Sequence, residues 1–165
     1  MEFARTISRK AGFPLTHHGR EQARDAGRHL AALLEGRADV ALHISPLGRA
    51  RETAEIIRTF VDAAPIIEPR IREVSIGSWD GLTHSDIDAG WPGALNGCNA
   101  YDWFFRAPEG ESYDEALARI CSWLSELTNV TVAVSHGLAG RIIRGAYLGL
   151  TRERTLSLPV HQEII

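Results

Sequence analysis

The sequence predicts an α/β fold, a three-layer α/β/α sandwich with a mostly parallel central sheet. Short apolar runs alternate with stretches whose apolar residues recur at helical spacing, and this alternation is typical of parallel sheets covered by helices. In Asn129–Arg141 (NVTVAVSHGLAGR) a β-branched run ends in Ser135-His136-Gly137 and passes directly into an amphipathic stretch. The chain shows no repeat, low-complexity segment or linker, so residues 1–165 are interpreted as one domain.

Composition narrows the class of protein. The 165 residues carry a formal net charge of -3 and a pI near 6.2, which argues against partners such as nucleic acid or a membrane surface. No run approaches the roughly 18 apolar residues of a membrane span, and no apolar leader core opens the chain. Cys98 and Cys121 are isolated, which argues against a disulfide framework or zinc site and favours a cytoplasmic protein.

The first quarter of the chain predicts a polar arm and a helix. Met1–Pro14 is basic and irregular, and it is either a solvated arm or a loop near an anion pocket. A helix over His17–Glu35 follows, with Thr16 as its N-cap. His17 and His18 fall in its first turn, so we expect them to be exposed.

A second strand and helix place an arginine near a sheet edge. Asp39–Ile44 predicts a buried parallel strand. Ser45 can cap the helix that follows, and Pro46 can occupy the first position of this helix, which runs to Val61. Arg49 lies in the first turn of this helix, Leu47–Val61. Its guanidinium is a fixed, permanently charged fork suited to phosphate oxygens.

The middle of the chain carries a candidate acid. Ala64–Glu68 predicts a strand, and Pro69–Gly81 a loop that holds Glu73. Glu73 is either a surface carboxylate or, folded into a pocket, a proton donor. Leu82–Pro108, which is rich in tryptophan, is either a lid over the site or a packed excursion.

The last third predicts three further elements. A capping box at Ser112–Glu115 opens a helix that runs to about Leu127. A helix over Leu138–Leu148 follows the strand that precedes His136. Thr151–Ile165, with Leu156, Leu158 and Val160 alternating, predicts an edge strand.

Two loops are expected to meet at one edge of the sheet. His136 follows a strand and precedes a helix, where free N–H groups and the helix dipole favour an anion. Gly137 permits close backbone approach, and the Leu138 N–H is placed to bind phosphate. If both strands belong to one parallel sheet, Arg49 points to the same edge, and the two side chains would share one oxyanion.

Five stretches together resemble the histidine phosphatase superfamily, also called the phosphoglycerate mutase-like family. They follow the order of that family along most of the chain: PLTHHGREQARDAG at Pro14–Gly27, SPLGRARETA at Ser45–Ala54, RIREVSIGSWDGL at Arg70–Leu82, PEGES at Pro108–Ser112 and VSHG at Val134–Gly137.

The resemblance implies a two-step phosphoryl transfer through a phosphohistidine. Arg49 matches the phosphate-clamping arginine of the family, His136 the second histidine, which donates hydrogen bonds to phosphoryl oxygens, and Glu73 the acid that protonates the leaving oxygen. The implied ligand is a small phosphorylated substrate or inorganic phosphate. The scheme requires no cofactor or metal, and no metal-ligand spacing is visible. The short Leu82–Pro108 insertion favours hydrolysis over mutase chemistry.

The chain departs from the family pattern at its start. The family carries the nucleophilic histidine in an Arg-His-Gly motif on the first strand, and no such motif occurs here. Either Met1 is a wrongly assigned or engineered start, or the protein is shortened and is an inactive phosphate-binding relative that acts through partner contacts. The C-terminus also stops early relative to the family. We therefore expect the chain alone to lack phosphatase activity.

Loss of a central strand would leave unpaired backbone groups. We expect either that Met1–Ser8 occupies the gap or that the chain self-associates, for instance as a homodimer.

Overall fold

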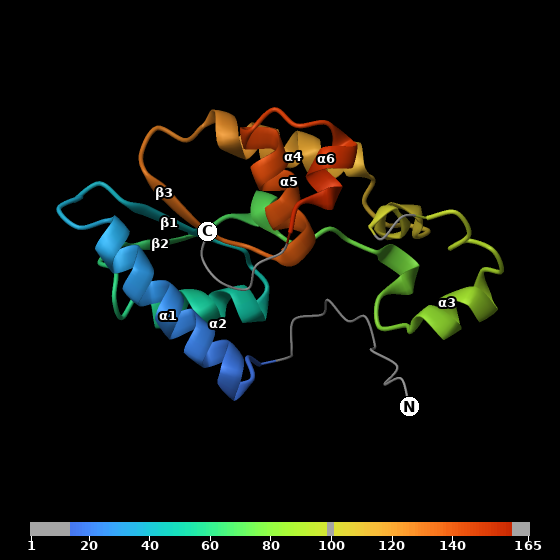
Figure 1. Cartoon of the computed structure of the whole chain (residues 1–165), viewed down its shortest axis with the longest axis horizontal. Coiled ribbons are helices and arrows are strands. Elements are labelled where there is room, and N and C mark those ends of the chain that lie inside the picture. The colour runs from blue at the N-terminus through green and yellow to red at the C-terminus, as the bar shows by residue number, and fades with distance from the viewer. Residues whose placement is uncertain (1–13, 99–100, 160–165) are drawn as a thin grey trace.

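The fold is a three-stranded parallel sheet covered by helices on both faces. We describe residues 14–98 and 101–159 of a computed structural model (Figure 1). The elements run in the order α1 (His17–Leu33), β1 (Ala41–Ile44), α2 (Gly48–Ile57), β2 (Pro65–Ile67), η1 (Pro69–Ile71), η2 (Gly77–Trp79), α3 (His84–Gly90), η3 (Asp102–Arg106), α4 (Tyr113–Ser125), β3 (Thr131–Val134), α5 (Gly137–Tyr147) and α6 (Arg152–Ser157).

The strand order is β2-β1-β3, with β1 parallel to both neighbours. Ile44 at the end of β1 lies opposite Val134 of β3 and Ile67 of β2. The carboxyl ends of all three strands therefore meet at one edge, which is where an open α/β sheet binds its ligands. β3 pairs only with β1 among the strands of the described ranges.

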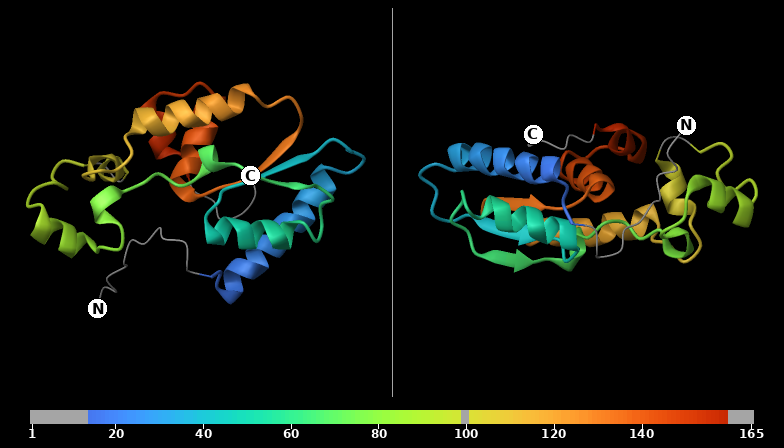
Figure 2. Two further views of the ribbon diagram at one scale, coloured as in Figure 1. Left: turned by 180° about the vertical axis from the view of Figure 1, so that it is seen from behind. Right: turned by 90° about the horizontal axis from the view of Figure 1, so that it is seen from below.

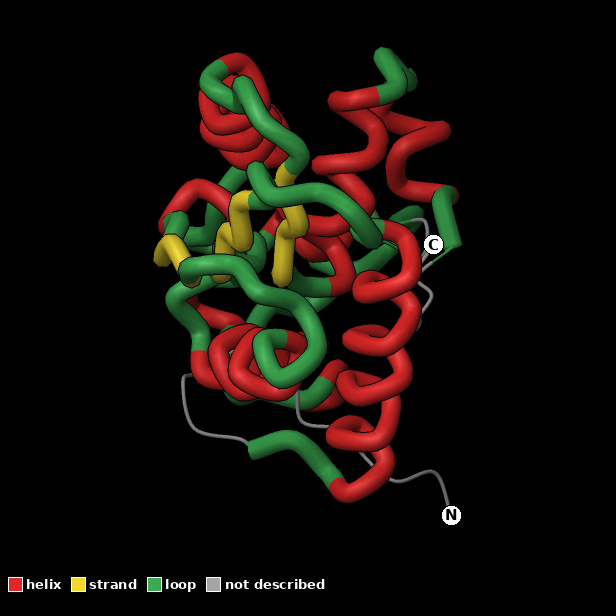
Figure 3. Tube along the Cα trace, turned by 90° about the vertical axis from the view of Figure 1, so that its left-hand side faces the viewer, coloured by secondary structure: helices red, strands yellow, loops and turns green. Residues whose placement is uncertain are grey.

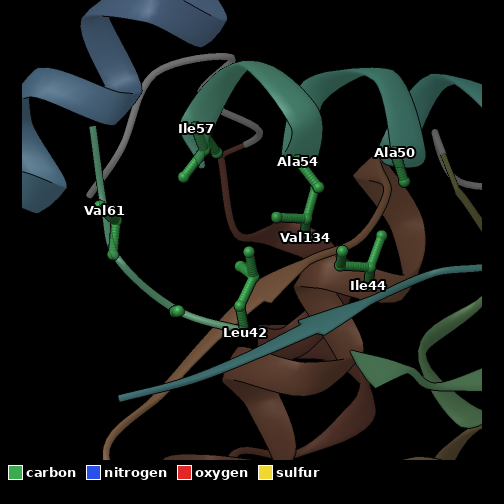
Figure 4. Close-up of a cluster of buried hydrophobic side chains, with 8 residues drawn as sticks. Leu42, Ile44, Ala50, Ala54, Ile57, Val61 and Val134 are labelled. Carbon is green, nitrogen blue, oxygen red and sulfur yellow. The ribbon is translucent and has the colours of Figure 1, made fainter. Parts of the chain in front are cut away.

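One face of the sheet packs against α2, with α1 lying across α2. Figure 4 shows Ala50, Ala54 and Ile57 of α2 directed onto strand side chains that include Leu42 and Val134. Leu42 and Ala54 are fully buried. Because successive strand residues point to opposite faces, His43 turns the other way and accepts a hydrogen bond from Trp123 Nε1 of α4, 2.9 Å from its Nδ1.

The opposite face is covered by α4, α5 and α6. Their core joins Ala116 and Ile120 of α4 to Ile142 of α5, together with Val74 from the loop after η1. Figure 2 shows the helices on the two sides of the strands, and Figure 3 shows the strands between them in a third direction. The three-layer arrangement predicted by the sequence is therefore confirmed.

The segment from Gly77 to Ala107 forms a side lobe, called here the aromatic lobe. It contains η2, α3 and η3 and stands away from the sheet (Figure 1). Trp79 is fully buried. The ring centroids of Trp91 and Trp103 lie 6.0 Å and 6.4 Å from its ring centroid. Of the two interpretations of Leu82–Pro108, the structure supports the packed excursion.

Two sequence-based boundaries are corrected. Thr151–Ile165 does not form the predicted edge strand in its described part: Thr151 accepts a hydrogen bond from the Arg154 N–H and starts α6. The alternation of three apolar residues therefore predicted the local structure less well than the capping residue Thr151 would have done. Helix α2 begins at Gly48, with Leu47 as an N-cap residue that makes no side-chain capping hydrogen bond. The hydroxyl of Ser45 instead forms a hydrogen bond with His136, described below.

The expectation that Met1–Ser8 fills a gap in the sheet concerns residues outside the described ranges, as does most of the Met1–Pro14 arm. The alternative, a homodimer, stays a prediction. Within the part of the chain that is described, no helix combines the length and apolarity needed to cross a bilayer.

Candidate active site

A pocket of about 270 Å³ lies where β1 and β3 end. The expected pair meets there: Arg49 and His136 both line it, together with Glu73 and Gly137. These residues come from α2, the loop after η1 and the start of α5, which the parallel sheet brings to one edge. The full lining is Leu15, Arg49, Ala50, Thr53, Glu73, Val134, Ser135, His136 and Gly137.

His136 is the N-cap residue of α5, with extended backbone angles. A hydrogen bond of 2.7 Å joins its Nε2 to Ser45 Oγ across 91 positions of sequence. Ser45 is fully buried, and its Oγ also accepts a hydrogen bond from the Leu47 N–H at 3.3 Å. Ser45 therefore fixes the direction of the imidazole ring.

Sequence reasoning missed this role of Ser45 and assigned it as a helix cap. The available signal was that Ser45 and His136 both follow parallel strands, whose carboxyl ends share an edge.

Glu73 is bound to the first turn of α5. Its carboxylate accepts hydrogen bonds from the Ala139 N–H at 2.9 Å and the Leu138 N–H at 3.3 Å. It also accepts one from the N–H of its neighbour Val74 at 3.0 Å. A negative charge at a helix N-terminus is stabilised by the dipole and by N–H groups that lack helical partners.

This contact corrects the expectation for Leu138. The Leu138 N–H donates to Glu73, its side chain is buried, and the residue is absent from the pocket lining. The anion at this helix terminus is therefore the protein's own carboxylate, and Gly137 is the residue of the turn that borders the pocket.

Arg49 lies on the opposite wall, in the first turn of α2. Its side chain is half-buried, and it makes no hydrogen bond or ion pair with another residue of the described ranges. A guanidinium that borders a pocket and has no carboxylate partner is available to bind an anion that enters the pocket. Thr53, four positions later on the same helix face, lines the pocket too.

Leu15 is a further lining residue that sequence reasoning missed. Its N–H donates a hydrogen bond of 2.8 Å to Glu52, which is paired with Arg20 at 2.5 Å. The entry of the chain into α1 is thereby fixed beside the pocket. Nothing in the local sequence indicated this contact, which spans 37 positions.

The remaining described histidines are not at the site. His17 and His18 are exposed at the start of α1, as expected, and His43 is engaged by Trp123. In the described ranges no group of three or more histidine, cysteine or acidic side chains is arranged to hold a metal ion.

Comparison with known proteins identifies the family. The sequence model of the histidine phosphatase superfamily (branch 1) matches residues 2–163. The chain therefore belongs to this superfamily of enzymes, as the sequence motifs indicated.

Relatives within the superfamily include phosphatases and mutases. The chain is 34% identical over 175 residues to a probable phosphoglycerate mutase GpmB of Photorhabdus laumondii, covering 94% of this chain and 74% of the relative. It is 32% identical over 154 residues to a glucosyl-3-phosphoglycerate phosphatase of Mycolicibacterium vanbaalenii, covering 88% of this chain and 64% of the relative.

Solved structures show the same fold. A mycobacterial glucosyl-3-phosphoglycerate phosphatase superposes with a TM-score of 0.75 at 28% identity, covering 93% of this chain and 76% of the other. A complex of the mycobacterial phosphatase with inorganic phosphate superposes with a TM-score of 0.73 at 27% identity, covering 94% and 79%. A protein solved in complex with inorganic phosphate thus shares the fold of this chain.

Proposed function

We propose that the pocket binds the phosphoryl group of a small phosphomonoester and supports its hydrolysis through a phosphohistidine. One observation carries the proposal: the half-buried, unpaired guanidinium of Arg49 faces the same small pocket as His136 and Glu73. A doubly negative phosphoryl group is the kind of ligand that such a cation and an imidazole neutralise together.

In the proposed reaction a histidine nitrogen attacks phosphorus and the ester P–O bond breaks. Glu73 gives a proton to the leaving oxygen, while Arg49 and His136 stabilise the transferring oxygens. Water then attacks phosphorus, the P–N bond breaks, and inorganic phosphate leaves. Hydrolysis is favoured over mutase chemistry because none of the described residues of the aromatic lobe lines the pocket to exclude water.

For this reaction we propose a nucleophilic histidine that lies outside the described ranges. The sequence has no histidine before His17, and His136 is the one described histidine that lines the pocket. We place the nucleophile on a further strand beside β3, whose exposed Ala133 marks an edge that no described strand covers. Such a strand, parallel to β3, would end beside His136.

A second candidate function is that of an inactive phosphate-binding relative that acts through partner contacts. The observation that favours it is the lack of a nucleophile in the described pocket. Both candidates predict phosphate binding, and they differ in turnover.

Turnover of an aryl phosphate with and without added imidazole separates the two. Imidazole can supply the missing nitrogen: its N–P bond forms as the ester bond breaks, and the phosphoimidazole is hydrolysed by water. We expect no turnover by the chain alone and turnover with imidazole, lost in His136→Ala.

Turnover without imidazole, abolished by His136→Ala, would show that a nucleophile has been overlooked. Phosphate binding without turnover in either condition would favour the inactive relative. Absence of phosphate binding by calorimetry would refute both. Phosphoglycerate esters are the next substrates to assay, because the names of both relatives contain this group.

A further inference from the structure

We propose that Glu111, on the turn before α4, is a positioning residue that holds Glu73 between the pocket and α5. This inference rests on the proposed function for its consequence in catalysis, but its structural content can be tested without turnover. Glu111 does not line the pocket and acts through the backbone around Glu73.

The segment that carries Glu73 has no regular structure to hold it. Residues 73–76 lie between η1 and η2 and belong to neither helix nor strand. Val74 and Ile76 are buried in two different cores, which fixes the apolar side of the segment. The direction of Glu73 depends on the polar side, where Glu111 lies.

Glu111 binds the chain on both sides of Glu73. Its Oε1 accepts a hydrogen bond from Arg72 Nη2 at 3.0 Å, and its Oε2 accepts one from the Ser75 N–H at 3.4 Å. The Glu111 N–H returns a hydrogen bond of 2.9 Å to the Ser75 carbonyl. One residue thus contacts the positions immediately before and two after Glu73, which restricts the backbone angles between them.

Arg119 of α4 holds the Glu111 carboxylate in place. Its Nε and Nη2 lie 2.6 Å and 2.9 Å from the two carboxylate oxygens, a bidentate pair. Its Nη1 also donates to the Arg70 carbonyl. Glu111 and Arg119 expose 8% and 10% of their side chains, so water does not compete strongly for these hydrogen bonds.

Glu126, the C-cap residue of α4, gives a matched comparison. Glu126 pairs with Arg70 at 2.7 Å but leaves 61% of its side chain exposed, and it contacts no residue between Arg72 and Ile76 by hydrogen bond. Its removal takes one acidic group from the same arginine-rich region without touching the backbone beside Glu73.

The Ala139 amide reports where Glu73 lies, because it donates to the Glu73 carboxylate. In the ¹⁵N-labelled full chain we expect Glu73→Gln to shift its resonance, a change called here the Ala139 response. We expect this response to be lost or strongly reduced when Glu73→Gln is made in a Glu111→Gln background, and to be unchanged in a Glu126→Gln background.

An unchanged Ala139 response in a folded Glu111→Gln protein would overturn the proposal. If Glu111→Gln does not fold, Arg72→Gln decides, because Arg72 is 42% exposed and its loss leaves the Glu111–Arg119 pair intact. A reduced Ala139 response in Arg72→Gln supports the proposal, and an unaltered response overturns it.

Kinetics with imidazole test the consequence. A proton donor matters most for a poor leaving group, so Glu111→Gln should lower kcat on an alkyl phosphate by about 100-fold and leave kcat on p-nitrophenyl phosphate nearly unchanged. An equal fall on both substrates would indicate a general loss of structure and would overturn the proposal. Failure of the unsubstituted chain to turn over counts against the proposed function alone, because the amide response requires no catalysis.

Discussion

The two walls of the pocket hold their charged side chains in different ways. On one wall His136 is joined to Ser45, and Glu73 to the start of α5. On the other wall Arg49 lacks a hydrogen-bond partner in the described part of the chain. Hydrogen bonds within the protein hold the side chains of the first wall, whereas the guanidinium of the second wall is available to an anion.

This difference predicts that the two walls contribute differently to ligand binding and to stability. Substitution of Arg49 should affect phosphate binding and leave folding unchanged. Substitutions on the opposite wall should change the free energy of unfolding as well. Four measurements, taken from the largest expected effect to the smallest, test this separation.

Arg49→Gln should weaken the binding of inorganic phosphate by about 10- to 100-fold, since a hydrogen bond to a charged group contributes about 1.5–3 kcal/mol. The free energy of unfolding should change by less than about 0.5 kcal/mol, because no partner is lost. Titration calorimetry and urea unfolding measure the two effects. Arg51→Gln, an exposed neighbour on the same helix, is the control and should bind as the parent does.

Ser45→Ala should lower both the affinity for phosphate and the free energy of unfolding. It leaves His136 without its 2.7 Å partner, and we expect a loss of about 1 kcal/mol in the free energy of unfolding and a few-fold loss in phosphate affinity. Ser125→Ala, at the exposed end of α4, serves as the comparison. Equal phosphate affinity in both variants would show that Ser45 does not orient the imidazole.

The pH dependence of stability tests the ion pair between Glu68 and Arg70. Arg70, through its hydrogen bonds and charge, lowers the pKa of Glu68 below the ordinary value of 4.5. The carboxylate therefore stabilises the fold fully above pH 4.5, and this contribution is lost as the pH falls through the lowered pKa. The free energy of unfolding, measured by chemical unfolding, should differ between pH 6 and pH 3 by about 1 kcal/mol less in Glu68→Gln than in the parent protein. Identical pH profiles would contradict this role.

Glu73→Gln should have effects of opposite sign. Loss of a carboxylate at the start of α5 should lower the free energy of unfolding by about 0.5 kcal/mol. Inorganic phosphate should bind slightly more tightly, because one negative charge beside the pocket is removed. Weaker phosphate binding in this variant, measured by calorimetry, would contradict this electrostatic effect of Glu73.

Much of the fold was predictable because its signals are local. Periodicity and the capping box at Ser112 indicated the helices, and the shared edge of parallel strands was enough to bring Arg49 towards His136. The helix α3 carried a similar signal, a capping box between Thr83 and Asp86, that was not identified in a segment dominated by tryptophan.

The missed features of the site depend on contacts between distant positions. The Leu138 N–H was expected to bind phosphate, but Glu73, which lies 65 positions earlier, occupies it. Ser45 was assigned as a helix cap, and its partner His136 lies 91 positions later. Neither choice is visible in local sequence, because helical capping and long-range pairing use the same polar groups.

The aromatic lobe leaves and rejoins the main body at adjacent points. The Ser78 N–H donates to the Pro108 carbonyl at 2.9 Å, and Gly77, at φ 45°, lies so close to Pro108 that a Cβ there would come within 2.1 Å of its oxygen. The two ends of the lobe are thus held together, and a module with neighbouring ends could replace its outer part, provided that Tyr101, Phe104 and Phe105, which pack against the core of α4, α5 and α6, are kept. Such an exchange would give the enzyme a new outer region and leave the residues that line the pocket in place.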